Sequence, residues 1–205
     1  MILLTAVVAG LAAALLRAGW TKRRLKPLSL KLEWLVVAAF LPQLLVFHLP
    51  ATRSGVPDTW APVVLVTTQA LLLVFAWANR KEPGFWALGV GLILNFTVIV
   101  LNGGLMPISP ETIRHLAPDL PASAWQLGQR LGDGKDVVLL PNTTWLSWLS
   151  DRFTLPRWIP YRVAFSIGDM FIAMGAFILI WSLAGPNQSH SIIYFSEEGP
   201  KEVKQ

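Results

Sequence analysis

The chain contains no cysteine, so disulfides, thiolate catalysis and iron–sulfur or cysteine-bound zinc sites are excluded within it. Charged residues make up only 14% of its 205 residues, compared with about 25% in an average soluble domain. Three histidines lie far apart in the sequence, which argues against a haem held by two of them. Only His48 falls in an apolar segment, where a lone histidine is more typical of a polar interface residue than of a ligand to a chlorophyll-type magnesium. The motifs of P-loop enzymes, serine hydrolases and zinc proteases are missing as well, and we expect no cofactor.

What the chain has instead is five long apolar segments. Between Glu82 and Glu111, 28 consecutive residues include no Asp, Glu, Lys or Arg, and Gly84–Leu101 within this stretch matches a hydrocarbon layer about 30 Å thick. The other four segments are Met1–Leu16, Leu35–Leu49, Ala61–Ala78 and Phe165–Ala184. Because a helix that is apolar on every side needs an apolar solvent, the sequence predicts an all-α integral membrane protein. We expect five transmembrane helices in one domain (residues 1–184), followed by a polar tail (residues 185–205).

The basic residues predict how these helices are oriented. Six of them crowd the short connection between the first two segments: Arg17, Lys22, Arg23, Arg24, Lys26 and Lys31. Short loops enriched in Lys and Arg face the cytoplasm, so we expect the N-terminus outside and the C-terminus inside. The region Arg17–Lys31 is also expected to contact anionic lipid headgroups. No nucleic-acid-reading motif accompanies the net charge of +5, so nucleic-acid binding is not expected.

This topology places residues 102–162 outside the cytoplasm, where prolines divide them into short pieces. Ser109-Pro110-Glu111 predicts a helix start with a capping side chain. Ala122–Leu131 predicts a second short amphipathic helix, and Asp136–Leu140 an extended run. Thr144–Leu149, with its tryptophans and leucines, predicts a helix lying flat in the membrane interface. We interpret residues 102–162 as a small lid over the outer ends of the helices.

Several residues inside the predicted spans are unusual. Pro42 is expected to kink or unwind the second span. Thr68 and Gln69 in the third span and Asn95 in the fourth are expected to hydrogen-bond between helices, with the lining of a solute path as the alternative. Six tryptophans lie near predicted span ends, where the headgroup region favours them: Trp20, Trp34, Trp60, Trp77, Trp86 and Trp181.

The strongest candidate for a functional residue is Asp169, near the start of the last span. An acid in a hydrophobic helix costs roughly 2.5–3.5 kcal/mol at mid-membrane and less near the surface, so it is expected to have partners. One interpretation gives Asp169 structural hydrogen bonds at the first turn of its helix, and the other gives it a functional role. The topology puts further polar and glycine residues at a similar depth, which predicts an outer polar cluster with Asp169: Ser166, Asn102, Gly103, Gly104, His48 and Arg162.

Two short motifs resemble those of a known group of proteins. Asn102-Gly103-Gly104-Leu105-Met106-Pro107, followed about 60 residues later by Phe165-Ser166-Ile167-Gly168-Asp169, is similar to a family of small bacterial membrane proteins defined as a domain of unknown function. The similarity extends from Met1 to about Ala184. It implies a multi-pass protein of the bacterial cytoplasmic (inner) membrane and implies no activity.

Three functions remain open from the sequence. The leading hypothesis is a non-catalytic accessory or scaffold subunit of a larger inner-membrane complex, because many small and aromatic packing residues occur without catalytic motifs. The second is a small transporter or channel for a polar solute or ion that uses Asp169, Asn95 and Gln69. The third is a membrane-embedded enzyme, for which Ser166 and Asp169 would lack an evident base.

Overall fold

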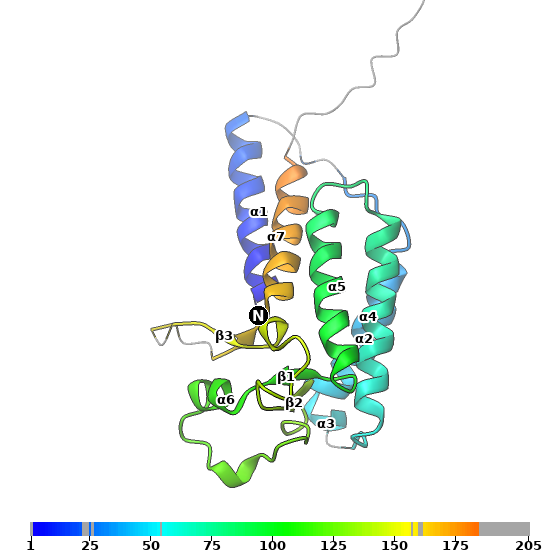
Figure 1. Ribbon diagram of the computed structural model, residues 1–205. Coiled ribbons are helices and arrows are strands. Elements are labelled where there is room, and N and C mark those ends of the chain that lie inside the picture. The colour runs from blue at the N-terminus through cyan, green and yellow to red at the C-terminus, as the bar shows by residue number, and fades with distance from the viewer. Residues whose placement is uncertain are drawn as a thin grey trace, which may run out of the picture.

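The computed structural model describes residues 2–21, 25, 27–53, 55–156, 158–159 and 162–184. The chain is mostly helical, with five apolar helices aligned along one axis (Figure 1). They are α1 (Ile2–Thr21), α2 (Trp34–Gln43) with its π-helical continuation η1 (Leu44–His48), α4 (Trp60–Ala78), α5 (Phe85–Leu101) and α7 (Ile167–Ser182). Two of them, α1 over Leu3–Thr21 and α4, are long and apolar enough to cross a membrane, and the other three are shorter apolar helices.

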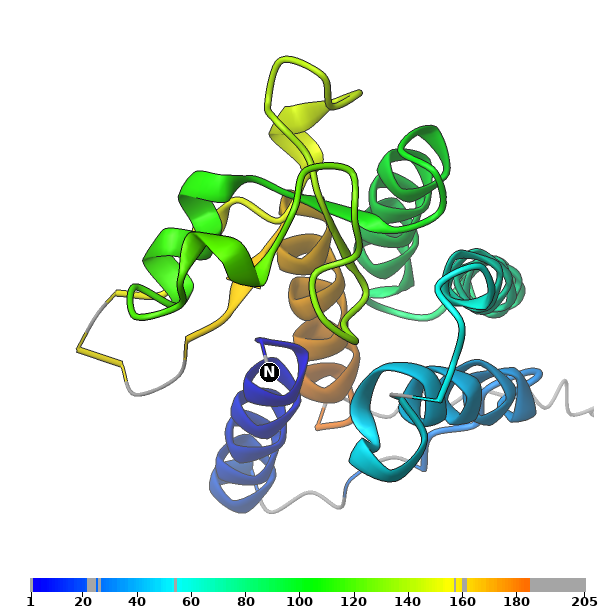
Figure 2. The same cartoon turned by 90° about the horizontal axis from the view of Figure 1, so that it is seen from below.

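The helices pack in the order α1, α7, α5, α4, α2 (Figure 2). The closest pair is α5 and α7, which meet through glycines that bring the two backbones together. A Cβ placed on Gly91 would lie 2.7 Å from the backbone nitrogen of Ile172 and closer still to the carbonyl oxygen of Gly168. A Cβ on Gly175 would lie 2.5 Å from the backbone nitrogen of Leu88. Small residues at such positions allow tight helix contact where lipid removes the hydrophobic driving force.

The second apolar segment changes its helical type directly after Pro42. The α-helical part ends at Gln43, and Leu44–His48 forms a π-helical turn closed by a 2.8 Å bond from the Leu49 N–H to the Leu44 carbonyl. Proline has no N–H and its ring crowds the preceding turn, and a wider turn is one way in which a helix absorbs such a disturbance. The expected irregularity in this span is therefore present.

The segment between α5 and α7, residues 102–166, forms a folded unit that we call the lid. It lies at the end of the helices where α1 begins, next to the short helix α3 (Pro50–Arg53) (Figure 1). Its strands β1 (Met106–Ile108) and β2 (Asp136–Val138) pair in parallel, and β3 (Phe153–Thr154) and β4 (Ala164–Phe165) pair antiparallel. Its helical pieces are α6 (Pro110–Leu116), η2 (Ala122–Ala124) and η3 (Ser147–Leu149).

These strands correct the expectation of a purely helical protein. The capped helix start at Ser109 is confirmed, because its side chain accepts a 3.1 Å bond from the Thr112 N–H, and the extended run after Asp136 is confirmed as β2. The helix predicted over Ala122–Leu131 is wrong. Only the three residues of η2 are helical, since Gly128 has a φ of +78° and the backbone that follows it bonds to β2. The helix predicted over Thr144–Leu149 is likewise reduced to η3.

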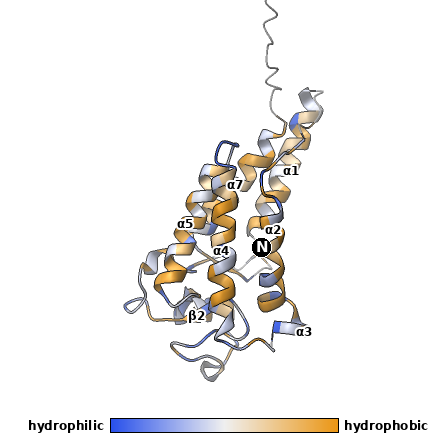
Figure 3. Ribbon diagram, turned by 90° about the vertical axis from the view of Figure 1, so that its right-hand side faces the viewer, coloured by the Kyte–Doolittle hydropathy of each residue, from blue (hydrophilic) through white to orange (hydrophobic). Residues whose placement is uncertain are grey.

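The lid shares a core with the helix ends rather than lying loosely above them. Leu105, Met106, Val137 and Leu149 of the lid pack with buried residues of η1, α4 and α5. Apolar residues are concentrated along the helices, and hydrophilic residues at their ends (Figure 3). The basic residues Lys22, Arg23, Arg24 and Lys26 and the predicted tail, residues 185–205, lie outside the described residues.

Candidate functional site

Asp169 belongs to a closed hydrogen-bond network at the lid end of α7. Ser166 caps this helix: its hydroxyl accepts a 3.0 Å bond from the Asp169 N–H, and the Asp169 carboxylate accepts a 3.1 Å bond from the Ser166 N–H. From α5, the Asn95 amide donates to the other Asp169 oxygen at 2.8 Å, and its carbonyl oxygen accepts from the Ser166 hydroxyl at 2.8 Å. Both carboxylate oxygens thus have protein donors, which offsets the cost of placing an acid in an apolar helix.

A glycine makes this network possible. A Cβ on Gly168 would overlap the Asn95 side chain and lie 2.8 Å from the Gly91 carbonyl oxygen. The missing side chain therefore lets Asn95 reach across to α7. Because Asn95 and Ser166 are themselves buried, each would leave an unpaired polar group if its partner were removed.

The remaining residues of the predicted polar cluster have other partners. The Asn102 amide donates to the carbonyl oxygens of Val98 at 2.7 Å and Trp145 at 2.9 Å, and its oxygen accepts from the Trp145 N–H at 2.9 Å. Asn102 thus holds η3 and the preceding turn on the end of α5. Gly103 and Gly104 follow it with φ values of +84° and +88°, which turn the chain into β1.

His48 and Arg162 are also bonded away from Asp169. The His48 ring contacts the Gln43 carbonyl oxygen at 3.3 Å, and the Arg162 guanidinium donates to the Leu116 carbonyl oxygen at 3.3 Å. Of the predicted cluster, Asp169 and Ser166 therefore bond to each other, and their shared partner is Asn95 rather than Asn102. The sequence contained Asn95 as a candidate but not its pairing, because the pairing depends on how α5 and α7 cross.

The other polar residues in the predicted spans lie between α2 and α4. The Gln43 amide donates to the Thr68 hydroxyl at 2.8 Å, and that hydroxyl donates back to the Val64 carbonyl oxygen at 2.7 Å. The side-chain oxygen of Gln69 is buried without a hydrogen-bond partner in the part of the chain described. Thr68 thus makes the expected bond between helices, and its partner Gln43 was not among the predicted residues.

A charged cluster that no sequence motif indicates lies in the lid. The Lys135 ammonium bonds to a carboxylate oxygen of Asp151 at 2.5 Å and of Asp136 at 3.0 Å. Asp151 is only 2% exposed, and one of its oxygens has no hydrogen-bond partner among the described residues. Burial raises the pKa of Asp151 to about 7, although Lys135 acts in the opposite direction. Partial burial lowers the pKa of Lys135, but the neighbouring Asp136 and Asp151 outweigh it and raise the pKa overall.

Arg130 fastens the lid to the helices. Its side chain is 3% exposed, and its guanidinium donates to carbonyl oxygens of Asp133 and Gly134 in the lid and of Val46 in η1. It also lies over the Phe47 ring at 5.3 Å. Sequence reasoning did not single out Arg130, because its contact with Val46 joins residues that are far apart in the chain.

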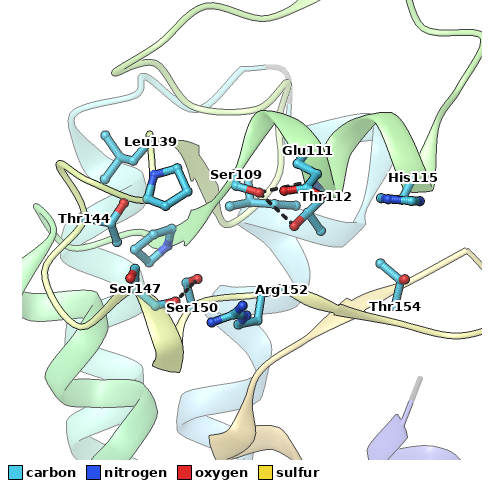
Figure 4. Close-up of a pocket in the computed structure, with 13 residues that line it drawn as sticks. Ser109, Glu111, Thr112, His115, Leu139, Thr144, Ser147, Ser150, Arg152 and Thr154 are labelled. Carbon is cyan, nitrogen blue, oxygen red and sulfur yellow. Dashed lines mark hydrogen bonds between the residues drawn. The ribbon is translucent and has the colours of Figure 1, made fainter.

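A polar cleft of about 270 Å³ opens in the lid between α6 and the segment leading into β3 (Figure 4). Glu111 and His115 lie on α6, and Arg152 lies on the opposite wall. Four apolar residues also line the cleft, together with six that carry hydroxyl groups: Ser109, Thr112, Thr144, Ser147, Ser150 and Thr154. Such a lining suits a small solute that carries hydroxyl groups and a negative charge. In the described ranges, no group of three His, Asp or Glu side chains is arranged to hold a metal ion.

A model of a family of unknown function, DUF5317, matches residues 27–181. The chain belongs to this family. The DUF5317 match includes the Asp169 network, the lid and its cleft, whereas α1 lies outside it. The chain is also 27% identical over 137 residues to an uncharacterized protein of Thermotoga maritima, covering 66% of this chain and 71% of that protein. No solved structure matches it.

Substitutions at Asp169 test the network directly. Asp169→Leu removes the acceptors of Asn95 and of the Ser166 N–H, and a lost partner of a buried polar group costs about 1–3 kcal/mol. Asp169→Asn keeps one acceptor oxygen, so this variant should lose less stability. We expect thermal unfolding in detergent to show that the wild type is the most stable protein, Asp169→Asn the next and Asp169→Leu the least stable. The control Asp119→Leu, at an exposed residue of the lid, should be close to the wild type. Equal stability of all four proteins would contradict a structural role for Asp169.

Proposed function

We propose that the chain is a five-span protein of the bacterial cytoplasmic membrane, with the lid on the outer side. The observation that carries this proposal is the outward-facing surface of the helices. Each of the five helices exposes large apolar side chains by more than half their area, for example Leu16, Phe40, Val63, Ile93 and Met170. Exposure of this surface to water costs about 25 cal/mol per Å², and a hydrocarbon solvent removes that cost.

Tryptophans and basic residues at the end of the helices away from the lid support the same proposal. Five exposed tryptophans lie there, each at a helix terminus or one residue from it: Trp20, Trp34, Trp77, Trp86 and Trp181. Arg17 lies over the Trp181 ring at 5.0 Å, and Arg80 over the Trp77 ring at 4.5 Å. An aromatic belt with cations beside it is typical of a membrane interface, and the excess of cations favours the cytoplasmic face.

Reporter fusions test this topology. Fusions placed after Lys81 should report a cytoplasmic position, and fusions near Arg53 and Gly132 should report an external one, because these loops lie at opposite ends of the helices. A fusion in the tail should agree with the one after Lys81. A cytoplasmic signal at Gly132 would contradict the five-span arrangement, because it would place the lid on the wrong side.

Within the membrane, we propose a non-catalytic role as an accessory or scaffold subunit of a larger complex. The helix at one edge of the row, α1, packs mainly on α7 and leaves most of its own surface uncovered. The polar groups of Asp169, Ser166 and Asn95 bond to one another rather than line a path. An uncovered edge helix suits contact with other membrane subunits better than passage of a solute.

The cleft in the lid favours a second candidate, the binding of a polar solute on the outer side. Arg152 supplies a cation, and six hydroxyl side chains and Glu111 line the same cleft. Binding at this position would not require the solute to cross the membrane. In this second candidate function, recognition of the solute depends on Arg152 and not on Asp169.

One extraction experiment separates the two candidates. We expect solubilisation in a gentle detergent, followed by a native gel, to give a heteromeric band for the accessory subunit. Leu11→Arg or Leu15→Arg on the exposed face of α1 should abolish that band, whereas Arg152→Gln should leave it unchanged. A monomer or homo-oligomer whose thermal stability rises with an added hydroxy acid, and loses that response with Arg152→Gln, would support the second candidate instead.

A further inference from the structure

A groove and a polar cavity adjoin each other at the end of the helices away from the lid. The groove lies between α4 and α5, has a volume of about 400 Å³ and is lined almost wholly by apolar side chains. The cavity has a volume of about 260 Å³ and lies between the α4–α5 turn and the segment before α2. Arg80 lines both of them, so the two volumes meet at its side chain.

The groove exists because one helix position has no side chain. A Cβ on Gly89 would meet only the Cβ of Ala76, at 3.9 Å, which leaves open space along this face of α5. Trp77 and Trp86 stand on either helix beside it and are both exposed. A flexible hydrocarbon chain would fill such a groove and bury its apolar walls, since good contact between apolar atoms is favourable even where water is absent.

The polar cavity is held in shape by Asn79. This side chain is buried; it donates to the Lys31 carbonyl oxygen at 2.9 Å and accepts from the Lys31 N–H at 2.8 Å. A third bond runs from its amide to the Phe75 carbonyl oxygen at 2.9 Å. Asn79 thus fixes the segment before α2 against the α4–α5 turn, and it brings Lys31 next to Arg80 and Lys81.

The charges of this cavity are unbalanced. Three cations, Lys31, Arg80 and Lys81, line it together with one acid, Glu82. Among the described residues, the Arg80 side chain donates one bond, to the Trp77 carbonyl oxygen at 3.0 Å, and its guanidinium carries five N–H donors in all. Donors therefore remain for an anion at the point where the polar cavity meets the apolar groove.

We propose that this is a binding site for an anionic phospholipid of the cytoplasmic leaflet. The phosphate would lie among Lys31, Arg80 and Lys81, and one acyl chain would lie in the groove over Gly89. The proposal rests on the five-span arrangement and goes beyond it, because it names one specific site with a built headgroup cavity. Basic pockets between helices on the cytoplasmic side are a known means of lipid recognition.

The test uses the full chain in nanodiscs of phosphatidylcholine with a minor fraction of phosphatidylglycerol. After release into mild detergent, native mass spectrometry counts the lipids that remain bound. We expect the wild type to retain phosphatidylglycerol over phosphatidylcholine. Arg80→Gln should reduce that retention about fivefold, the effect of one basic residue near an anionic lipid. Gly89→Leu, which fills the groove, should reduce the retention of both lipids.

Matched controls make the same changes away from the site. Gly19→Leu, on α1, adds the same side chain where no atom of the described residues lies within 4 Å, and Arg114→Gln removes an exposed cation of α6, in the lid at the opposite end of the helices; neither should change lipid retention. Equal retention of both lipids by the wild type, or unchanged retention by Gly89→Leu, overturns the proposal. Capture of a protein instead of a lipid by a photocrosslinker placed at Val90 also overturns the proposal. A chain that fails to enter the nanodisc contradicts the five-span proposal as well, whereas one that enters without lipid preference contradicts only this site.

Discussion

Gly91→Ala is expected to lower the free energy of unfolding by about 3 kcal/mol, at the upper end of the usual cost of overpacking. The new methyl group would lie 2.7 Å from the Ile172 nitrogen and even closer to the Gly168 carbonyl oxygen. Both are backbone atoms of α7 and cannot rotate away as a side-chain end can. The two helices would have to separate, and Asn95, one turn further along α5, would be drawn away from Ser166 and Asp169.

Gly89→Ala provides the matched control two residues earlier on the same helix. Its methyl group would meet only Ala76, at an ordinary contact distance of 3.9 Å. Because alanine favours helix over glycine by about 1 kcal/mol, this variant should be as stable as the wild type or more so. Thermal unfolding of both variants in the same detergent measures the contrast. A Gly91→Ala protein as stable as Gly89→Ala would mean that α5 and α7 do not pack through these glycines.

The same pair of glycines illustrates how much of the fold the sequence could provide. The five apolar segments predicted the five helices, because length and composition depend on local residues alone. The partners of each helix could not be predicted, since Gly89 and Gly91 are equivalent in composition and differ only in what lies opposite them. The pairing of the lid strands could not be predicted for a similar reason: β1 and β2 are three residues long and lie 27 residues apart in sequence.

The sequence predicted which residues belong to the candidate site better than it predicted their hydrogen-bond partners. Asp169 was found because an acid in an apolar helix is costly and therefore conspicuous. A similar depth along the helices predicted Asn102 as its partner, but Asn102 is the C-cap of α5 and bonds to the lid, whereas Asn95 lies two turns deeper and faces α7. Lys135 and Asp151 were missed because a lysine and an acid in a polar loop give no local sign of burial.

Lys135→Met is expected to destabilise the protein strongly at pH 8, by about 3 kcal/mol. The Lys135 ammonium is the cation bonded to the buried Asp151, and removal of one partner from a buried pair costs about 3–5 kcal/mol. Lys135 is 41% exposed, so solvent screening places the expected value at the low end of that range. Arg53→Met is the control, because the Arg53–Asp133 pair is 43% and 44% exposed and should contribute less than about 1 kcal/mol.

The effect of Lys135→Met should depend on pH in a direction that identifies Asp151. Because burial raises the pKa of Asp151 from 3.8 to about 7, its contribution to stability is fully present below the ordinary pKa and is lost as the pH rises through 7. Without the ammonium that opposes this rise, the carboxyl group of the variant stays protonated to a still higher pH. At pH 5 Asp151 is therefore mostly neutral in both proteins, so little charge is left unpaired by the substitution. Unfolding measured at pH 5 and pH 8 should show a cost for Lys135→Met that shrinks at the lower pH, and a small, constant cost for Arg53→Met. An equal cost at both values would mean that Lys135 stabilises the lid through its packing and not through the charge of Asp151.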